Sequence, residues 1–169
     1  MPHHILIVDD EEAVRLILRD LFESRGYHIT ESVDGADALE KLKAMTGEEA
    51  PDLILADYQM PNVDGVDFLI AAHDICPETI RILLTAHGDL EVAVNAINDA
   101  RIYKFITKPW NNRDLLITAQ RALEHYDLIR ENQAFADMLE MMVEESSKEM
   151  GRLRDALKDM ASRIRGLID

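Results

Sequence analysis

Five short, mostly apolar runs constrain the fold of this chain more than any other feature of its sequence. They are suited to β-strands, and they are separated by segments in which apolar residues recur at helical spacing. The expected strands are 4–8, 27–32, 53–56, 79–84 and 102–106, and the expected helices are 11–25, 36–44, 68–75 and 91–99. Continuously apolar strands that alternate with helices form parallel sheets covered on both faces. We therefore predict an α/β fold built on a five-stranded, parallel, doubly wound sheet.

The last third of the chain has a different pattern. Residues 111–169 contain no proline and only two glycines. Every seventh position from Leu115 to Ile164 is apolar, whereas the companion positions three residues later are mixed. An apolar column at heptad spacing is typical of a coiled coil. We predict a front domain over residues 1–122, followed by a long C-terminal helix that forms an extension over residues 123–169.

A solvated helix of this length needs a partner for its apolar column, because isolated helices gain little stability from intrinsic propensity. We expect a second copy of the chain to supply that partner in a parallel homodimer. Polar companion positions such as His125 and Asn132 would weaken the part nearest the front domain. Two alternatives stay open. The helix could remain alone in solvent, or it could fold back as a hairpin near Ser146 and Ser147 or at Gly151.

Composition narrows the possible partners and the compartment. The chain has 33 acidic and 18 basic residues, a formal net charge of −15, which repels nucleic-acid phosphates and anionic lipids. Cys76 is the only cysteine, so no internal disulfide can form. There is no signal-like segment at the start, and no apolar run approaches the ~20 residues that cross a bilayer. We expect a cytoplasmic protein that binds neither nucleic acid nor membranes directly.

Ionisable and hydroxyl side chains stand where the predicted strands end. Asp9 and Asp10 follow the first strand, Asp57 the third, Thr85 and Ala86 the fourth, and Lys108 the fifth. The carboxyl ends of parallel strands meet at one edge of a sheet, where such folds bind ligands. Carboxylates gathered at this edge suit Mg²⁺, while a lysine and a hydroxyl can contact phosphoryl oxygens. The sequence therefore predicts Mg²⁺-dependent phosphoryl transfer to a carboxylate.

In order and spacing, these residues resemble the response-regulator receiver family, whose fold is flavodoxin-like. The resemblance covers roughly residues 4–122 and rests on Asp9-Asp10, on the run from Asp57 to Gly65, on Thr85-Ala86, and on Lys108-Pro109. It implies a two-component signalling domain that accepts a phosphoryl group from a histidine kinase or a phosphotransfer protein. It does not imply an enzyme that acts on a separate substrate.

The resemblance also implies a role for the acidic residues. Asp57 would be the phospho-acceptor and a Mg²⁺ ligand. Asp10 would bind the ion directly, Asp9 mainly through water, and the backbone carbonyl of Gln59 would complete the protein ligands.

The remaining implied roles concern the phosphoryl group. Lys108 would contact the phosphate, Thr85 would swing toward it, and Ala86 would leave it room. Phe105 stands at the switch position, where many relatives carry tyrosine, so any readout there depends on packing. The positions that usually tune dephosphorylation are Gln59 and His87. The Lys108–Pro109 bond is often cis in this family.

Two other classes of protein share part of this pattern. A phosphatase of the haloacid-dehalogenase class needs an Asp-x-Asp arrangement after the first strand, and the sequence here is Asp9-Asp10-Glu11. A flavin-binding module of the same topology needs serine, threonine and glycine in that loop, which is acidic instead.

In receiver proteins that look like this one, such a helix commonly leads to an output domain, for instance a cyclic-di-nucleotide synthase or phosphodiesterase or a kinase. Otherwise the coiled coil itself is the output.

Overall fold

A computed structural model describes residues 2–45, 47–86 and 101–166. The elements in these ranges are β1 (His4–Val8), α1 (Glu12–Glu23), β2 (His28–Ser32), α2 (Gly35–Ala44), a 3₁₀ turn (Gly47–Glu49), β3 (Leu53–Asp57), α3 (Gly65–Ile75), β4 (Ile80–Ala86), β5 (Lys104–Lys108) and α5 (Asn112–Arg165). The helix expected over 91–99 and the residue His87 lie outside the described residues.

The five strands form one parallel sheet with the order β2-β1-β3-β4-β5. The chain first builds outward from β1 to β2 and then returns across β1 to β3, so the direction of building reverses between β1 and β3. At such a reversal the loops that leave the two strands run to opposite faces of the sheet, and the crevice between them at the carboxyl ends has space for a ligand. The prediction of a doubly wound parallel sheet is confirmed.

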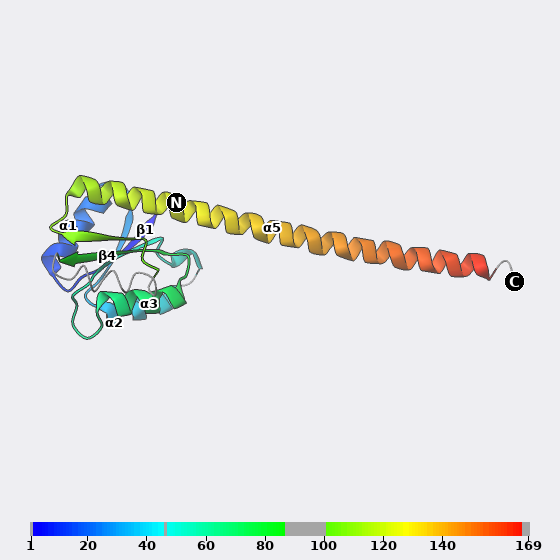
Figure 1. Cartoon of the computed structure of the whole chain (residues 1–169), viewed down its shortest axis with the longest axis horizontal. Coiled ribbons are helices and arrows are strands. Elements are labelled where there is room, and N and C mark those ends of the chain that lie inside the picture. Colours follow the sequence, from blue (N-terminus) through cyan, green and yellow to red (C-terminus); the bar gives the residue numbers. More distant parts are fainter. Residues whose placement is uncertain (1, 46, 87–100, 167–169) are drawn as a thin grey trace. The chain divides into compact units, whose positions relative to one another are not determined.

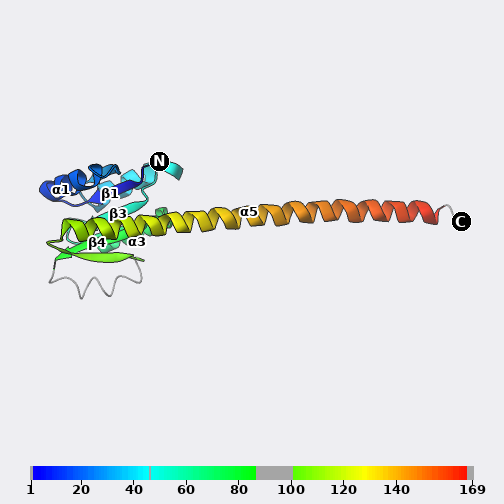
Figure 2. The ribbon, with the colours of Figure 1, turned by 90° about the horizontal axis from the view of Figure 1, so that it is seen from above.

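Helices cover both faces of the sheet (Figure 1, Figure 2). The helix α1 and the first turns of α5 lie on one face, and α2 and α3 pack together on the other. Because successive side chains of a strand point to opposite faces, a strand that is covered on both faces is apolar along most of its length. This explains the continuous apolar runs of β1 and β3, in which the side chains of Ile5 to Val8 and of Leu53 to Ala56 are fully buried.

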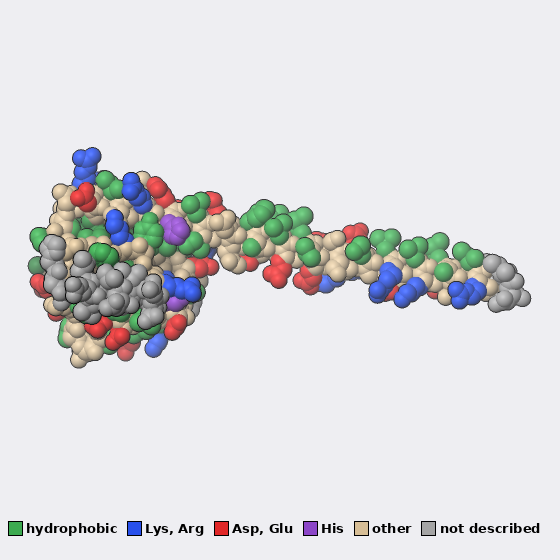
Figure 3. Space-filling view, viewed as in Figure 1, with side chains coloured by type: hydrophobic (Ala, Val, Ile, Leu, Met, Phe, Trp, Pro, Cys, Tyr) green, Lys and Arg blue, Asp and Glu red, His purple; other side chains and the backbone are tan. Residues whose placement is uncertain are grey.

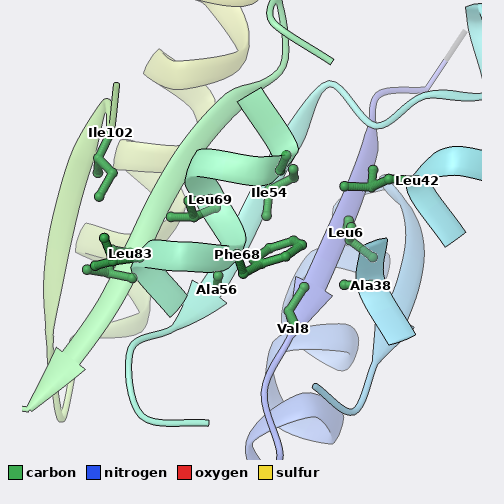
Figure 4. Close-up of a cluster of buried hydrophobic side chains, with 12 residues drawn as sticks. Leu6, Val8, Ala38, Leu42, Ile54, Ala56, Phe68, Leu69, Leu83 and Ile102 are labelled. Atoms are coloured by element: carbon green, nitrogen blue, oxygen red, sulfur yellow. The ribbon is translucent and has the colours of Figure 1, made fainter. Parts of the chain in front are cut away.

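The core beneath α2 and α3 is a single hydrophobic cluster (Figure 4). Leu6 and Val8 of β1, Ile54 and Ala56 of β3 and Leu83 of β4 contribute the sheet side. The helices contribute Ala38, Leu42, Phe68 and Leu69. On the opposite face, the buried side chains of α1 and α5 include Leu18, Phe22, Leu115, Ala119 and Ala122.

Several element boundaries differ from the prediction by one to three residues. The helix α3 begins at Gly65 rather than at residue 68, because the Asp64 side chain caps it by accepting hydrogen bonds from the backbone N–H groups of Val66 and Asp67. The strand β4 continues to Ala86, and β5 covers 104–108 instead of 102–106. Ile102 is buried in the core before β5 starts, so its apolar character reports packing and not strand pairing.

The long helix α5 runs without interruption from Asn112 to Arg165. It continues through Ser146, Ser147 and Gly151, so no hairpin forms at those residues. The chain divides into two compact units, residues 1–128 and 129–169. No helix in the described ranges is apolar and long enough to cross a membrane.

Within the second unit, large apolar side chains are exposed. In Figure 3, hydrophobic side chains predominate along one side of this helix and charged side chains along the other. The large apolar side chains of the unit are 46–72% exposed and comprise Phe135, Met138, Leu139, Met141, Met142, Val143, Met150, Leu153, Leu157, Met160 and Ile164.

Candidate functional site

The first part of the candidate site is the loop that follows β1. Asp9 is fully buried there, and Asp10 is exposed. The Asp9 side chain accepts a hydrogen bond from the backbone N–H of Glu11 at 2.9 Å, and the Arg15 guanidinium donates to the Asp9 carbonyl at 2.8 Å. These two bonds fix the backbone of the loop, so the Asp9 carboxylate has a defined position although it lies beyond the strand.

The second part of the site is Asp57, the last residue of β3, whose residue surface is 5% exposed. Val8 at the end of β1 is paired with Ala56, so the ends of the two strands lie side by side. Asp9, Asp10 and Asp57 each offer a carboxylate oxygen, and these three oxygens lie within 4.8 Å of one another. The convergence of carboxylates that the sequence predicted is therefore present in the structure.

The third part of the site is Lys108, the last residue of β5. Its ammonium lies 2.9 Å from Asp57 Oδ1 and 3.0 Å from Asp9 Oδ2. The lysine enters from the far side of β4, because β5 is separated from β3 by that strand. One cation thus contacts carboxylates from two strands. The Lys108–Pro109 bond that follows is cis, as the resemblance implies.

Burial and charge shift the proton affinities in this cluster. Burial raises the pKa of Asp57, and the neighbouring carboxylates of Asp9 and Asp10 add to this, while the hydrogen bond from Lys108 opposes it. Burial disfavours the Lys108 ammonium, but its hydrogen bonds with Asp57 and Asp9 outweigh that effect and raise the pKa of Lys108. The lysine is therefore held as a cation.

The charges of the cluster suit a divalent cation. Three ionised carboxylates and one ammonium leave an excess of two negative charges in a partly buried space. Oxygen ligands of this kind are those that hard cations such as Mg²⁺ prefer. The donor set therefore fits the metal that the sequence predicted.

Thr85 and Ala86 occupy the end of β4, beside Lys108. Thr85 is fully buried and its hydroxyl donates to the Ala86 carbonyl at 3.3 Å. Ala86 is exposed and is paired with Lys108 across the two strands. Thr85 is paired with Thr107, so both predicted β4 residues lie at the same edge of the sheet as the acidic cluster.

Phe105 lies apart from the carboxylates. It is paired with Leu83, is partly buried, and packs against the hydrophobic core under α2 and α3. Since residues two apart on a strand point to the same face, Leu83 and Thr85 share a face with Phe105. Phe105 has no polar atom in its side chain, so its contacts on this face are packing contacts.

A surface pocket opens beside the carboxylates. It is lined by Asp10, Tyr58, Gln59, Met60, Pro61 and Asp64. Gln59 is exposed and forms part of this wall, next to Asp10. The pocket therefore borders the acidic cluster at Asp10.

The geometry of the site requires glycine at position 65, and this requirement was not predicted from the sequence. A Cβ atom at Gly65 would lie 2.0 Å from the Asp57 carbonyl oxygen and 2.9 Å from the Tyr58 Cα atom. The Gly65 N–H donates to the Tyr58 carbonyl at 2.8 Å, which draws the start of α3 against the end of β3. Only glycine permits this approach. The Asp64-Gly65 pair after Pro61 was the available signal.

Comparison with known proteins identifies the family. The sequence model described as "Response regulator receiver domain" matches residues 5–120. This chain belongs to the response regulator receiver family. As a receiver it is a signalling domain, and receivers of response regulators interact with histidine kinases or phosphotransfer proteins.

Named relatives agree with this assignment. The chain is 35% identical over 133 residues to the hydrogenase transcriptional regulatory protein HoxA of Bradyrhizobium diazoefficiens, covering 76% of this chain and 26% of HoxA. It is 30% identical over 162 residues to the C4-dicarboxylate transport transcriptional regulatory protein DctD of Rhizobium meliloti, covering 93% of this chain and 34% of DctD. The chain thus spans about a quarter to a third of the length of these curated relatives.

A solved structure shares the fold. The signal receiver domain of an HD domain-containing protein from Pseudomonas fluorescens Pf-5 has a TM-score of 0.71 and 34% sequence identity, covering 77% of this chain and 93% of that one.

Proposed function

We propose that this receiver accepts a phosphoryl group on Asp57 from a histidine kinase or a phosphotransfer protein. The observation that carries the proposal is the position of the Asp57 carboxylate, which lies among two other carboxylates and 2.9 Å from the Lys108 ammonium. A carboxylate in this setting has a cation on one side and an open pocket nearby. The modification is an acyl phosphate that changes the charge and size of one side chain.

The proposed metal ligands are the carboxylates of Asp9, Asp10 and Asp57 and the backbone carbonyl of Gln59. Asp10 would bind the ion directly, and the buried Asp9 would act mainly through water. Mg²⁺, when bound, offsets the negative charge that develops on the transferred phosphoryl group.

The chain's own residues supply the rest of the chemistry. An Asp57 oxygen forms the bond to phosphorus, and the donor's bond to phosphorus breaks, with its electron pair staying on the donor. Lys108 donates to a phosphoryl oxygen as a fixed positive charge. Thr85 turns its hydroxyl from the Ala86 carbonyl toward the phosphoryl group, Ala86 leaves it room, and Phe105 follows by repacking against the core. Hydrolysis of the acyl phosphate by water returns Asp57 to its original state.

We also propose that the two parts of the chain have different functions. Residues 1–122 are the receiver, and the helical extension, residues 123–169, joins two copies as a parallel coiled coil. The support for the dimer is the exposed apolar column on α5, which includes Val143, Met150, Leu157 and Ile164. Burying such side chains contributes roughly 1 kcal/mol or more each. Phosphorylation controls this helix, and through it an output domain or partner.

Intact-mass analysis after incubation with acetyl phosphate and Mg²⁺ tests the phospho-acceptor. We expect wild type to gain one phosphoryl mass that hydroxylamine removes, and Asp57→Asn to gain none. Asp67→Asn is the matched control, because Asp67 is an exposed acid in the first turn of α3, and it should be labelled like wild type. Equal labelling of wild type and Asp57→Asn would refute the assignment.

A further inference from the structure

Large apolar side chains on α5 recur 18 residues apart within the second compact unit. An α-helix makes five turns in 18 residues, so both members of each pair point in the same direction. They are 46–63% exposed, and the pairs are Phe135 and Leu153, Leu139 and Leu157, and Met142 and Met160. In Figure 3, hydrophobic side chains accordingly follow one side of this part of the helix. We name these six side chains, together with Met150 and Ile164, the α5 seam.

The α5 seam is not one uninterrupted seven-residue repeat. Its members stand alternately four and three residues apart from Phe135 to Met142, and again from Met150 to Ile164. Between Met142 and Met150, however, two four-residue steps follow each other, with Ser146 at the middle. Four residues inserted into a seven-residue repeat form a stutter, which locally unwinds a coiled coil. The two halves of the seam therefore belong to different heptad frames.

We propose that two copies of the chain pair in parallel along the α5 seam, with this change of frame. Phe135 and Met142 then lie in the interface. Their neighbours Ala136 and Val143 lie at its edge. The inference rests on the proposed dimer and specifies its contacts. The seven-residue column that ends at Ile164 would instead place Ala136 and Val143 inside, but that column drifts around the helix, because seven residues fall about 20° short of two turns.

Burial of apolar surface favours the α5 seam over the seven-residue column. Phe135 and Ala136 are adjacent exposed residues, and the two arrangements differ in which of them is covered. Hydrophobic stabilisation scales with the apolar area removed from water, and a phenylalanine ring has far more of it than an alanine methyl group. Pairing through Ala136 would leave at its edge the Phe135 ring, which is 63% exposed in the single chain. The same comparison holds for Met142 and the smaller Val143.

The residues that flank the α5 seam agree with a second copy in parallel. In such a pair, a flanking residue of one helix lies near the residue five positions further along the other helix. Glu149 of one copy thus faces Arg154 of the other, and both are exposed and opposite in charge. Met138 faces Val143, which widens the apolar contact before the change of frame. No like charges meet at the flanking positions of residues 131–161.

Disulfide cross-linking of the full chain tests the α5 seam. Single cysteines replace Phe135, Ala136 or Leu157 in a Cys76→Ser background, since Cys76 is the only native cysteine. Copper phenanthroline serves as the oxidant, no phosphodonor is added, and non-reducing electrophoresis measures the rate. Position 157 lies in the interface under either arrangement, so Leu157→Cys reports the parallel dimer itself. We expect Leu157→Cys and Phe135→Cys to cross-link, and Ala136→Cys to react at least tenfold more slowly than Phe135→Cys.

Two deletions test the change of frame independently. Removing residues 143–146 takes out the four inserted residues, so the remaining seam follows one seven-residue repeat. Removing residues 143–145 leaves the two halves of the seam one residue out of step. We therefore expect the three-residue deletion to have a dissociation constant at least tenfold above that of the four-residue deletion in sedimentation equilibrium. An uninterrupted seven-residue column predicts no such advantage, because both deletions interrupt it.

Two results would overturn the inference and leave the dimer in place. One is cross-linking of Ala136→Cys at least as fast as that of Phe135→Cys, while Leu157→Cys also reacts. The other is a four-residue deletion that dimerises no better than the three-residue deletion. If Leu157→Cys does not cross-link, the parallel dimer itself is contradicted, and the inference falls with it. The phospho-acceptor proposal is untouched by any of these outcomes, because no phosphodonor is present.

Discussion

The Lys108 ammonium and the Asp57 carboxylate are 2.9 Å apart although they come from strands that are not neighbours in the sheet. The same ammonium reaches Asp9 at 3.0 Å, so it bridges the ends of β1 and β3. This geometry gives Lys108 two tasks. It offsets repulsion between carboxylates in the resting protein, and it offers a positive charge to an incoming phosphoryl group.

Removing that ammonium should slow phosphorylation. We expect Lys108→Met to reduce the initial rate of labelling by acetyl phosphate by about tenfold or more, because a preorganised charge near the reacting group is lost. Time-resolved intact-mass analysis measures the rate. Lys104→Met, at an exposed position in the same strand, is the control and should react like wild type. A wild-type rate in Lys108→Met would remove the lysine from the mechanism.

Mg²⁺ should stabilise the folded chain. A ligand that binds only the native state at about 100 times its dissociation constant adds about 2.7 kcal/mol to the free energy of unfolding. We expect saturating Mg²⁺ to raise the urea midpoint of wild type and to have much less effect on Asp10→Asn. Asp10 is exposed, so this variant should fold, and Asp20→Asn on α1 serves as the control. An identical midpoint with and without Mg²⁺ would contradict the metal site.

Because the pKa of Asp57 is raised, ionisation of this carboxylate in metal-free buffer should lower the free energy of unfolding as the pH rises. Burial is the main cause, so the folded state holds the proton more tightly than the unfolded state does. The favourable contribution of Asp57 is therefore complete below its unfolded pKa near 3.8 and is lost as the pH rises through the folded value. We expect Asp57→Asn to be more stable than wild type at pH 7, with a difference that narrows toward pH 4.

Chemical unfolding in the presence of EDTA measures this difference. Saturating Mg²⁺ should reduce or reverse it, because the ion stabilises the ionised carboxylate. A wild type that is as stable as Asp57→Asn at pH 7 without metal would show that burial does not penalise the charge.

A side chain at position 65 should lower the stability of the fold and slow the phosphorylation of Asp57. Its hypothetical Cβ atom lies 2.0 Å from the Asp57 carbonyl oxygen, so Gly65→Ala must displace backbone at the phospho-acceptor. We expect a loss of about 1–3 kcal/mol in the free energy of unfolding, together with slower labelling of Asp57. Gly151→Ala is the matched control, because a Cβ atom there meets open space inside a helix. It should stabilise by about 0.5–1 kcal/mol, and equal effects of the two substitutions would contradict the predicted clash.

Much of the site could be predicted from the sequence because its residues stand at the ends of strands. Asp9, Asp57 and Lys108 each follow an apolar run, and parallel strands must bring their carboxyl ends to one edge. The limits of β5 could not be predicted in the same way. Ile102 is apolar because it packs in the core, and its sequence character does not distinguish this from strand pairing.

Contacts that depend on tertiary packing could not be predicted from the sequence either. The need for glycine at position 65 arises from the approach of α3 to the end of β3, which no local pattern encodes. Likewise, the side chains of His3 and Asp127 lie 3.4 Å apart only because α5 passes beside the residue that precedes β1. A histidine near the start of a chain carries no sequence signal of such a partner.

The proposed dimer predicts that apolar and charged positions of α5 respond differently. Leu157→Asp places a charge in the apolar column. We expect it to raise the dissociation constant of the dimer, measured by sedimentation equilibrium, by at least tenfold. Lys158→Asp, at the next residue and outside the column, should leave the assembly nearly unchanged. A monomeric wild type at all accessible concentrations would rule out the dimer, and the exposed column would then need a different partner.

The position of the acyl phosphate is the most direct test of the central claim. Borohydride reduces an acyl phosphate to an alcohol, so labelled protein that is trapped in this way and digested should contain homoserine in place of aspartate at the modified residue. We predict homoserine at position 57 in wild type treated with acetyl phosphate and Mg²⁺, and none when EDTA replaces the metal. Homoserine at position 9 or 10, or at none of the three, would contradict the account.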